Sequence, residues 1–469
     1  MVDWIGRNVD SLIDHYLAVC MLIGLFILSV IGAGDVRVVS MLGLLLCVTG
    51  LAQKTARVDL WIFLPFAGYT LSSMASSWAA YGNMVDGYGV MHLIFPTIYL
   101  LMACLGREDQ LLVKTGCVLW AGMAAAAGIG QFVYNALVLE SPRRMGGVLG
   151  NPNAMGIFLV ISWFALNYCT AGQRENGGKL HRLLPHLEPL LLAALALTLS
   201  MGSFVAMAAG ILVLLTGKRK EAAGGSAPGP WKETFRYGSR LLAKASLGVG
   251  TGMLLYLAAA RTGVPGSCLL ILGYLLALAY SWKPVDRFLE ASPRTAAVMA
   301  LGGVLVAAAA VLVRPSAAAT FAERLEMMRN GLSYLARAPV LGVGPFRWRA
   351  LNLADSDKYF NTWHIHNVLL HVGVELGWIS MAMLALAAAR ACIKRHDRSL
   401  KAELAAFCTH SLMDTGFFYL GITSLALLTI GEPGQGGKQT GGLVLKALFG
   451  IFALIYGYAW YLSMGVKGG

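Results

Sequence analysis

The sequence predicts an all-α, polytopic transmembrane helical bundle of about 12–14 spans, with a large extracytoplasmic loop containing a helix between late spans. Of the 469 residues, 57% are hydrophobic and only 13% are charged, whereas about one quarter of the residues of a water-soluble globule are charged. The mean hydropathy is +0.65. Several apolar runs reach about 20 residues, the length that a helix needs to cross roughly 30 Å of hydrocarbon.

The apolar runs follow one another along the whole chain, so we expect residues 1–469 to form a single integral membrane domain. Short polar links separate the runs, and stretches rich in Gly and Ala blur their ends. The predicted spans are 15–34, 38–52, 59–79, 91–105, 115–138, 153–171, 188–200, 203–217, 241–260, 264–282, 295–313, 365–390, 402–430 and 443–464.

The basic residues, which give a net charge of +13, lie mainly between the apolar runs. They therefore indicate membrane orientation rather than a nucleic-acid partner. The positive-inside rule places both termini in the cytoplasm and the links 80–90, 139–152 and 315–364 outside. The link 218–240 is rich in Gly and Pro and is predicted to be a flexible cytoplasmic linker. The eight cysteines lack CxxC spacing, so neither a zinc site nor a disulfide framework is expected.

The outer link 315–364 carries many basic residues despite facing outward, which favours an anionic partner there. We predict an amphipathic helix over 320–337 that starts with a capping box of Thr320 and Glu323. Arg324 lies at the border of its apolar stripe, where a guanidinium needs a partner. Its planar donors match a diphosphate, and a structural ion pair is the alternative. The stripe consists of Phe321, Leu325, Met328, Leu332 and Leu335.

A second outer segment, residues 141–156, combines Arg143 and Arg144 with a glycine-rich turn before a span. Asn151 is suited to cap the helix, and Pro152 to occupy its first position, so the plain interpretation is a well-formed helix start. The functional interpretation adds that the two arginines stand beside a helix N-terminus, where phosphate binds readily.

The segment WHIHNVLLHVGVELG follows the outer link and begins the next span. His364 and His366 lie at the water boundary, and His371 and Glu375 are four residues apart and share a helix face. Polar groups in a membrane helix are costly and usually functional, although a lone interfacial histidine often only completes a hydrogen bond. The segment has no HExxH-like frame, and we expect no metal.

His410 and Asp414 are four residues apart in the penultimate predicted span, and on a continuous helix they would face one way. An intramembrane aspartate needs a partner. The plain interpretation is a His–Asp pair that locks two helices together.

Together these segments resemble the O-antigen ligase and O-antigen polymerase superfamily of bacterial membrane glycosyltransferases. The resemblance covers roughly residues 140–430 and depends on the order of its motifs and on the large outer loop. The motifs are Arg144 with the GNPN of 150–153, LTLSMGSF at 197–204, ERLEMMRNGL at 323–332, APVLGVGPFRW at 338–348, HIHN at 364–367, ELG at 375–377 and HSLMD at 410–414.

The resemblance implies transfer of a polyprenyl-diphosphate-linked glycan to an acceptor hydroxyl, on the outer face of the bacterial inner membrane. The partners would be this donor, a glycan or lipid-glycan acceptor and membrane lipid, with no cofactor, metal or nucleotide sugar. It implies catalysis by His366, His364 and Arg324, with His366 acting as base or orienting group. It further implies donor diphosphate binding by Arg324, Arg143, Arg144 and Arg329, and supporting roles for Asn367, Glu375, His410 and Asp414.

The sequence departs from the family at one position. The family often has an arginine after the serine of LTLS, and here Met201 occupies that place. Either Arg143 or Arg144 supplies the charge, or the donor is held differently. Ligation of a finished polymer and polymerisation of repeat units use the same chemistry, so both remain open. The alternative class is a transporter or flippase for a lipid-linked or anionic sugar.

Overall fold

The computed structural model describes residues 15–31, 34–175, 179–223, 230–262, 265–312, 317–355, 360, 362–394, 397–431 and 438–465. Contacts divide the described chain into two compact units, and the single membrane domain stays a prediction. Unit 1 comprises residues 1–117, 323–396 and 411–469, and unit 2 comprises residues 118–322 and 397–410.

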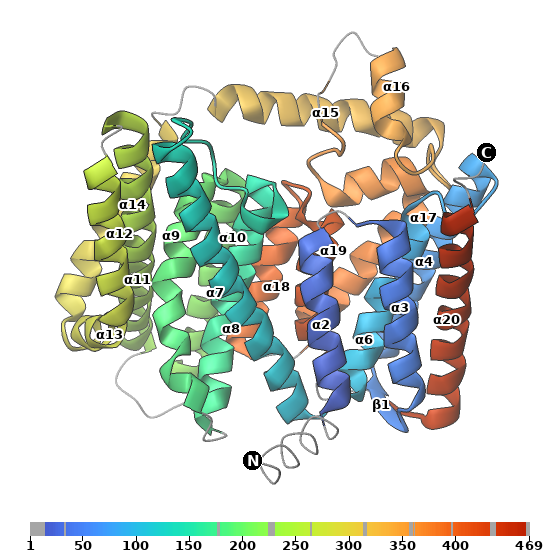
Figure 1. Ribbon diagram of the computed structural model, residues 1–469, viewed down its shortest axis with the longest axis horizontal. Coiled ribbons are helices and arrows are strands. Elements are labelled where there is room, and N and C mark those ends of the chain that lie inside the picture. Colours follow the sequence, from blue (N-terminus) through green and yellow to red (C-terminus); the bar gives the residue numbers. More distant parts are fainter. Residues whose placement is uncertain are drawn as a thin grey trace. The chain divides into compact units, whose positions relative to one another are not determined.

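Unit 1 is built from helices of the two ends of the chain. In it α3 packs against α20, and α4 packs against α17 (Figure 1). A short antiparallel ladder pairs Thr55 with Gly441 and Val58 with Lys438. Its elements are α2 (Tyr16–Ile31), α3 (Val36–Leu51), β1 (Thr55–Val58), α4 (Leu60–Tyr81), α5 (Tyr88–His92), α6 (Ile94–Cys104), the start of α7 (Arg107–Leu137), most of α15 (Ala317–Arg337), α16 (Arg347–Asp355), α17 (Val368–Ile393), η5 (Gly416–Phe418), α19 (Leu420–Ile430), β2 (Lys438–Gly441) and α20 (Gly442–Gly465).

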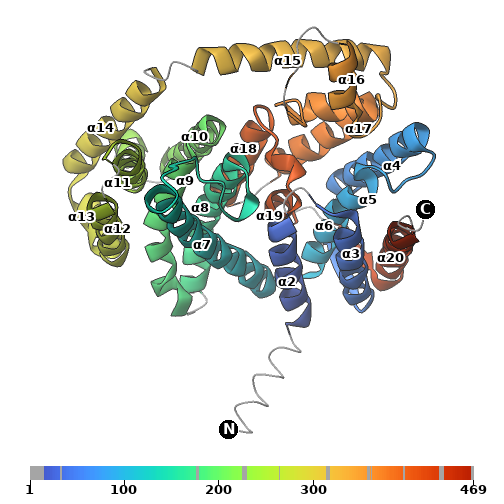
Figure 2. The ribbon, with the colours of Figure 1, turned by 45° about the horizontal axis from the view of Figure 1, so that its top comes forward.

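The regular elements among the described residues of unit 2 are all helices. Its α11 packs against α9 and α14, and α8 packs against α9; α11 to α14 gather together in Figure 2. Its elements are most of α7, η1 (Gly147–Leu149), α8 (Pro152–Glu175), η2 (Lys179–Arg182), η3 (Leu184–Leu187), α9 (Glu188–Thr198), α10 (Met201–Ala223), α11 (Pro230–Leu257), η4 (Ala258–Thr262), α12 (Pro265–Tyr280), α13 (Trp282–Ala291), α14 (Pro293–Leu312) and α18 (Arg398–Ser411).

The all-α polytopic prediction is confirmed, although the helices differ in length from the expected spans. Among the described residues, 5 helices are long and apolar enough to cross a membrane, or 6 if the pair α12 and α13, bent by 68°, forms one span. Other expected spans are shorter apolar helices, such as α2, α3, α9 and α19. The long helices are Arg107–Leu137, Pro152–Glu175, Trp231–Ala260, Val368–Ile393 and Gly442–Met464.

The expected linker 218–240 is mostly helical. Helix α10 continues to Ala223 and α11 begins at Pro230, so only 224–229 lies outside the described residues. The predicted start of the outer helix is also wrong. Because α15 begins at Ala317, Thr320 lies inside the helix and cannot form a capping box with Glu323.

The packed face of α15 differs from the predicted stripe. Phe321, Leu325 and Leu332 are 62%, 49% and 56% exposed, whereas Met327 and Tyr334 are buried in a hydrophobic cluster that Met328 and Leu335 adjoin. Of the five stripe residues, only Met328 and Leu335 therefore pack as expected. Their cluster partners include Ile365 before α17 and Val374 within it, so α15 lies against the N-terminal part of α17.

Helix α17 is interrupted at Gly377, which has φ +85° and ψ 169°. A Cβ at this position would lie 1.9 Å from the carbonyl oxygen of Val340, so only glycine allows the approach. The interruption lets the loop after α15 pair with α17: Val343 N–H donates to Val374 O at 2.8 Å, and Trp378 N–H donates to Pro339 O at 2.8 Å. The LGVGPFRW run is thus a bend fixed against α17.

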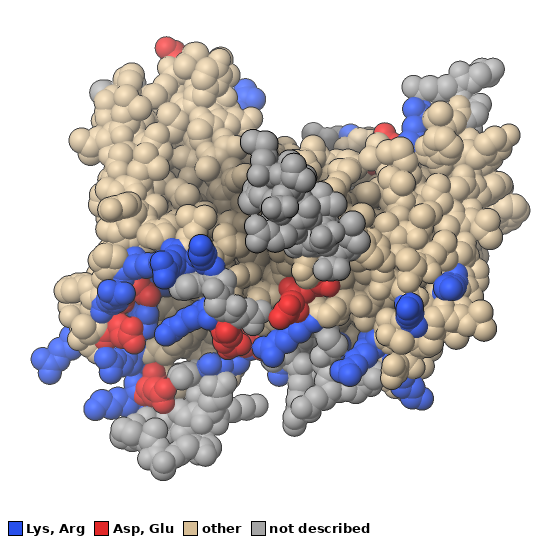
Figure 3. Space-filling view, turned by 60° about the horizontal axis from the view of Figure 1, so that its bottom comes forward, with Lys and Arg blue, Asp and Glu red and all other residues tan. Residues whose placement is uncertain are grey.

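One end of unit 2 carries a cluster of charged residues, seen at the left of Figure 3. Arg240 makes two hydrogen bonds to the Asp286 carboxylate, of 2.8 and 2.6 Å. Lys244 pairs with the buried Glu188 at 2.6 Å. These basic residues lie in or beside links predicted to be cytoplasmic, and that orientation stays a prediction.

Candidate active site

The turn after α18 places a carboxylate inside unit 1. Helix α18 ends at Ser411, and Asp414 lies three residues beyond it with 1% of its surface exposed. The backbone N–H of Thr415 donates to Asp414 Oδ1 at 2.8 Å. A buried carboxylate is costly unless further partners compensate its charge.

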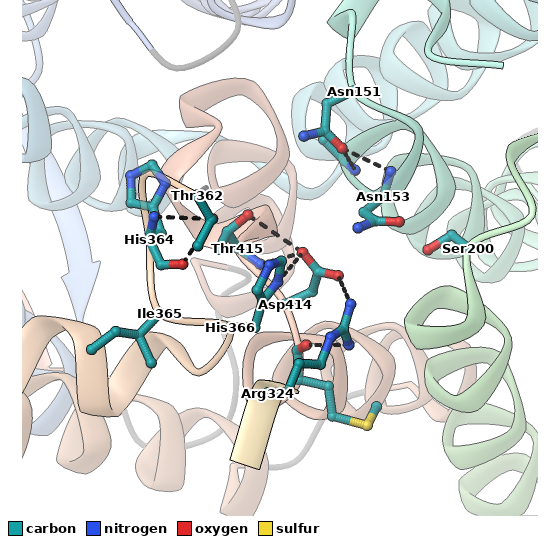
Figure 4. A network of polar contacts seen from close by, with 12 residues as sticks. Asn151, Asn153, Ser200, Arg324, Thr362, His364, Ile365, His366, Asp414 and Thr415 are labelled. Carbon is teal, nitrogen blue, oxygen red and sulfur yellow. Dashed lines mark hydrogen bonds and ion pairs between the residues drawn. The ribbon is translucent and has the colours of Figure 1, made fainter. Parts of the chain in front are cut away.

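Arg324 and His366 supply those partners from two other elements of the unit (Figure 4). Nη2 of Arg324 lies 3.2 Å from Asp414 Oδ2, and Nη1 of Arg324 donates to the carbonyl oxygen of Met413 at 2.9 Å. Nδ1 of His366 lies 3.3 Å from Asp414 Oδ1. The Arg324 and His366 side chains keep exposed fractions of 23% and 21%, so both remain reachable from outside. The guanidinium and the imidazole therefore converge on one carboxylate.

The backbone around His366 is fixed on both sides. Asn367 is the N-cap of α17, and its side chain accepts from Leu370 N–H at 3.0 Å. On the other side, Ile365 N–H donates to Nδ1 of His371 at 3.3 Å, and the Ile365 side chain is fully buried. Hydrogen bonds on both sides therefore fix the backbone of the short segment that carries His366.

Glu375 connects α17 to the loop before α16 and to the first turn of α16. Its carboxylate accepts from Phe346 N–H at 2.8 Å and from Trp348 N–H at 3.1 Å, and it lies 3.4 Å from Nε2 of His371. His371 and Glu375 both have no exposed side-chain surface. The predicted shared face of these two residues is confirmed, and their role in the structure is to connect two loops.

We expect Glu375→Ala to lower the free energy of unfolding on the order of 2–5 kcal/mol, because two backbone N–H groups lose their acceptor inside the protein. Thermal unfolding of the purified protein in detergent measures this. Glu375→Gln keeps one side-chain oxygen and should lose less. Equal melting temperatures for the wild type and the alanine variant would contradict this role for Glu375.

His364 has a different environment from His366. Its ring stacks on Phe418 with 4.4 Å between centroids, and it contacts His371 edge-on at 4.9 Å. Figure 4 shows it pointing away from Asp414. Burial, reinforced by the neighbouring His371 and His366, lowers the pKa of His364 well below its ordinary value of 6.5. Its imidazole is therefore neutral at neutral pH and belongs to an aromatic cluster.

The arginine-bearing segment of unit 2 is well ordered by local contacts. Asn151 caps α8, accepting from Asn153 N–H at 2.8 Å, as predicted. Arg144 donates to the Asn153 side-chain oxygen at 2.6 Å and to Thr198 O at 2.9 Å. Within unit 2, Arg144 is thus held at the segment that immediately precedes Met201. Arg143 instead donates to the Ser141 hydroxyl at 3.0 Å.

Two other predicted site residues, Arg329 and His410, lie on α15 and α18. Arg329 is exposed on α15, and five residues separate it from Arg324, which amounts to about 140° around the helix. His410 is fully buried in the last turn of α18. Because α18 ends at Ser411, the expected helical i,i+4 arrangement of His410 and Asp414 is wrong.

The Arg324–Asp414 pairing was the main relation that the sequence interpretation missed. The signal was present in two places: a buried aspartate needs a partner, and a guanidinium turned toward an apolar face needs one too. The Arg324 guanidinium and the Asp414 carboxylate are therefore partners of each other. Among the described residues, no group of three or more His, Cys, Asp or Glu side chains is arranged to hold a metal ion.

The arrangement has the components of a general-base site with an anion-binding group. With a proton on Nδ1, His366 directs that nitrogen toward Asp414, and Nε2 is left to accept a proton from a hydroxyl. Arg324 has five N–H donors, of which two are used by Met413 and Asp414. The remaining donors can bind phosphate oxygens.

Comparison with known proteins supports the resemblance drawn from the sequence. A family model described as O-antigen ligase matches residues 246–385, which include Arg324, His366 and Glu375. The search of curated proteins gives no match. The resemblance to the O-antigen ligase superfamily is therefore confirmed over this part of the chain. Together with the long apolar helices, this match supports an integral membrane protein that is similar to the O-antigen ligase family over these residues.

Proposed function

We propose, from the O-antigen ligase family match over residues 246–385, that the protein is a membrane glycosyltransferase. It transfers a glycan from a polyprenyl diphosphate to an acceptor hydroxyl, on the extracytoplasmic face of the bacterial inner membrane. The observation that supports this most is the convergence of Arg324 and His366 on Asp414. Two elements far apart in the chain bring together an anion-binding group and a base, which are the two groups that this transfer needs.

The proposed step is a substitution at the anomeric carbon of the donor sugar. The acceptor oxygen forms a bond to that carbon, while the bond from the carbon to the diphosphate oxygen breaks. The diphosphate leaves with the bonding electron pair, and Arg324 stabilises its growing negative charge. The acceptor proton passes to Nε2 of His366, and the Asp414 carboxylate stabilises the imidazolium that forms.

Arg144 is the candidate for the charge that the family often carries at the position of Met201. Its hydrogen bond to Thr198 O holds its guanidinium near the start of α10. We propose that Arg144 contributes to donor binding, and that Arg143, which bonds to the Ser141 hydroxyl, and Arg329 do so less directly.

An assay with the purified protein, polyprenyl-diphosphate oligosaccharide and a candidate acceptor tests the function. A ladder of longer products identifies a polymerase, and a single shifted acceptor identifies a ligase. Movement of the lipid-linked glycan across proteoliposome membranes without any transfer would instead identify a transporter and refute the proposal.

We expect Arg324→Lys to lose about 99% of the transfer activity, roughly the effect of removing one group that stabilises transition-state charge. A single ammonium cannot bond Met413 O, Asp414 and a diphosphate at the same time. Initial rates at saturating donor measure the loss. Arg337→Lys, at the exposed end of the same helix, is the matched control and should keep the wild-type rate. Wild-type rates in Arg324→Lys would remove this residue from the site.

A further inference from the structure

Trp363 is an exposed aromatic residue in the segment that carries His366. Its side chain is 64% exposed, although tryptophan is buried to a large extent in most proteins. The backbone on either side is fixed, because His364 N–H donates to the Thr362 hydroxyl at 3.4 Å and that hydroxyl donates to His364 O at 3.1 Å. A large apolar ring is thus held outside the core by an ordered segment.

One face of the Trp363 ring is occupied by Arg349. The guanidinium carbon lies 3.9 Å from the ring centroid, well inside the range of cation–π contacts. Arg349 belongs to α16. The preceding residue, Trp348, is fully buried, and its backbone N–H donates to the Glu375 carboxylate. The guanidinium therefore holds the indole in one orientation, with the exposed surface on the rest of the ring.

Trp363 belongs to the same short segment as the proposed base. His366 is the third residue after Trp363, so their Cα atoms are at most about 10 Å apart. A pyranose has a face of C–H groups that packs on an aromatic ring, with hydroxyls at its edge for nearby polar groups. A fixed, half-covered indole beside a glycan-transfer site has the shape and chemistry for such a contact.

We infer that Trp363, supported by Arg349, is a sugar subsite on which one pyranose ring of the glycan substrate stacks. This inference rests on the proposed function. The stacked ring belongs either to the donor or to the acceptor, and the kinetics below distinguish them. Indole rings also anchor membrane proteins at the lipid headgroups. That role does not require a guanidinium fixed against one face, and it is an outcome of the test.

The test compares the wild type, Trp363→Ala and Trp363→Phe in lipid nanodiscs, with Trp78→Ala as a control at another exposed tryptophan. We expect Trp363→Ala to raise one KM about 5- to 10-fold, the size of one aromatic stacking contact. The phenylalanine variant should recover most of this, because it keeps an aromatic face. A rise in the acceptor KM alone assigns the ring to the acceptor, and a rise in the donor KM alone assigns it to the donor.

Unchanged KM values for both substrates overturn the subsite. A loss of folded protein from the nanodiscs, equal in the alanine and phenylalanine variants, identifies a membrane anchor and overturns it too. Direct binding measurements distinguish failure of the subsite from failure of the proposed function. Saturation-transfer NMR uses two soluble probes. One is the glycan released by mild acid from the lipid-linked donor, and the other is the glycan released by mild acid from the cell surface. Binding lost in Trp363→Ala supports the subsite even if no transfer occurs, and equal binding in both proteins refutes it.

Discussion

Replacing His366 by alanine is expected to reduce glycan transfer about 10²- to 10⁴-fold, the usual contribution of a positioned general base. The imidazole is held toward Asp414 with Nδ1 3.3 Å from its carboxylate, and 21% of its side chain stays exposed. Initial rates with purified protein and lipid-linked oligosaccharide measure the loss. The melting temperature should change little, because Asn367 and Ile365 fix the segment and because Arg324 and Thr415 N–H remain as partners of Asp414.

The matched control for this variant is His15→Ala. His15 also pairs with a carboxylate, that of Asp109, at the start of α2 and α7. A general loss from removing any His–Asp pair would appear in both variants, whereas a loss at the proposed base appears only in His366→Ala. Added imidazole should restore part of the rate to a His366→Gly variant. Full transfer by His366→Ala would refute the mechanism.

The fold class and several helix starts could be predicted from the sequence because their causes are local. Apolar length and charge between the runs indicate membrane helices whatever their packing. Asn151 before Pro152, and Asn367 before the apolar run of α17, cap helices through side-chain bonds to N–H groups two or three residues away. Such contacts depend on a few consecutive residues only.

The turn containing Asp414 could not be predicted in this way. Hydropathy treats 402–430 as one apolar run, but the structure has two helices, α18 and α19, with a turn and η5 between them. A break in a membrane helix is tolerated where its backbone groups find partners. Here Arg324 donates to the carbonyl oxygen of Met413, and the Asp414 side chain accepts from Thr415 N–H. Hydropathy carries no information about such partners.

The face of α15 was predicted wrongly for a related reason. In a soluble protein, a stripe of Phe321, Leu325 and Leu332 marks the buried side of a helix. Beside a bilayer, lipid tails are as apolar as a protein core, so a hydrophobic stripe does not identify the face that packs on protein. The packed face is instead the one with Met327, Tyr334 and the charged Arg324, which reaches Asp414.

Asp414→Asn is expected to lower transfer about 10³- to 10⁴-fold, the effect of an asparagine in place of the carboxylate of a Ser–His–Asp triad. The asparagine can donate to Nδ1 of His366. That would place the imidazole proton on Nε2, where the base must be free. The change also leaves Arg324 without its 3.2 Å carboxylate partner. The rate at saturating substrate measures the loss, and Asp397→Asn, on an exposed residue before α18, is the control.

Two further measurements distinguish an effect of Asp414→Asn on stability from an effect on catalysis. Removing one member of a buried ion pair can cost about 3–5 kcal/mol of folding free energy, so the melting temperature of Asp414→Asn must be measured and transfer assayed well below it. If Asp414 acts only through His366, the double variant Asp414→Asn/His366→Ala should be no slower than the slower single variant, because residues that act as one unit are not additive. Losses that multiply would mean that Asp414 and His366 act independently, and the proposed dyad would then be wrong.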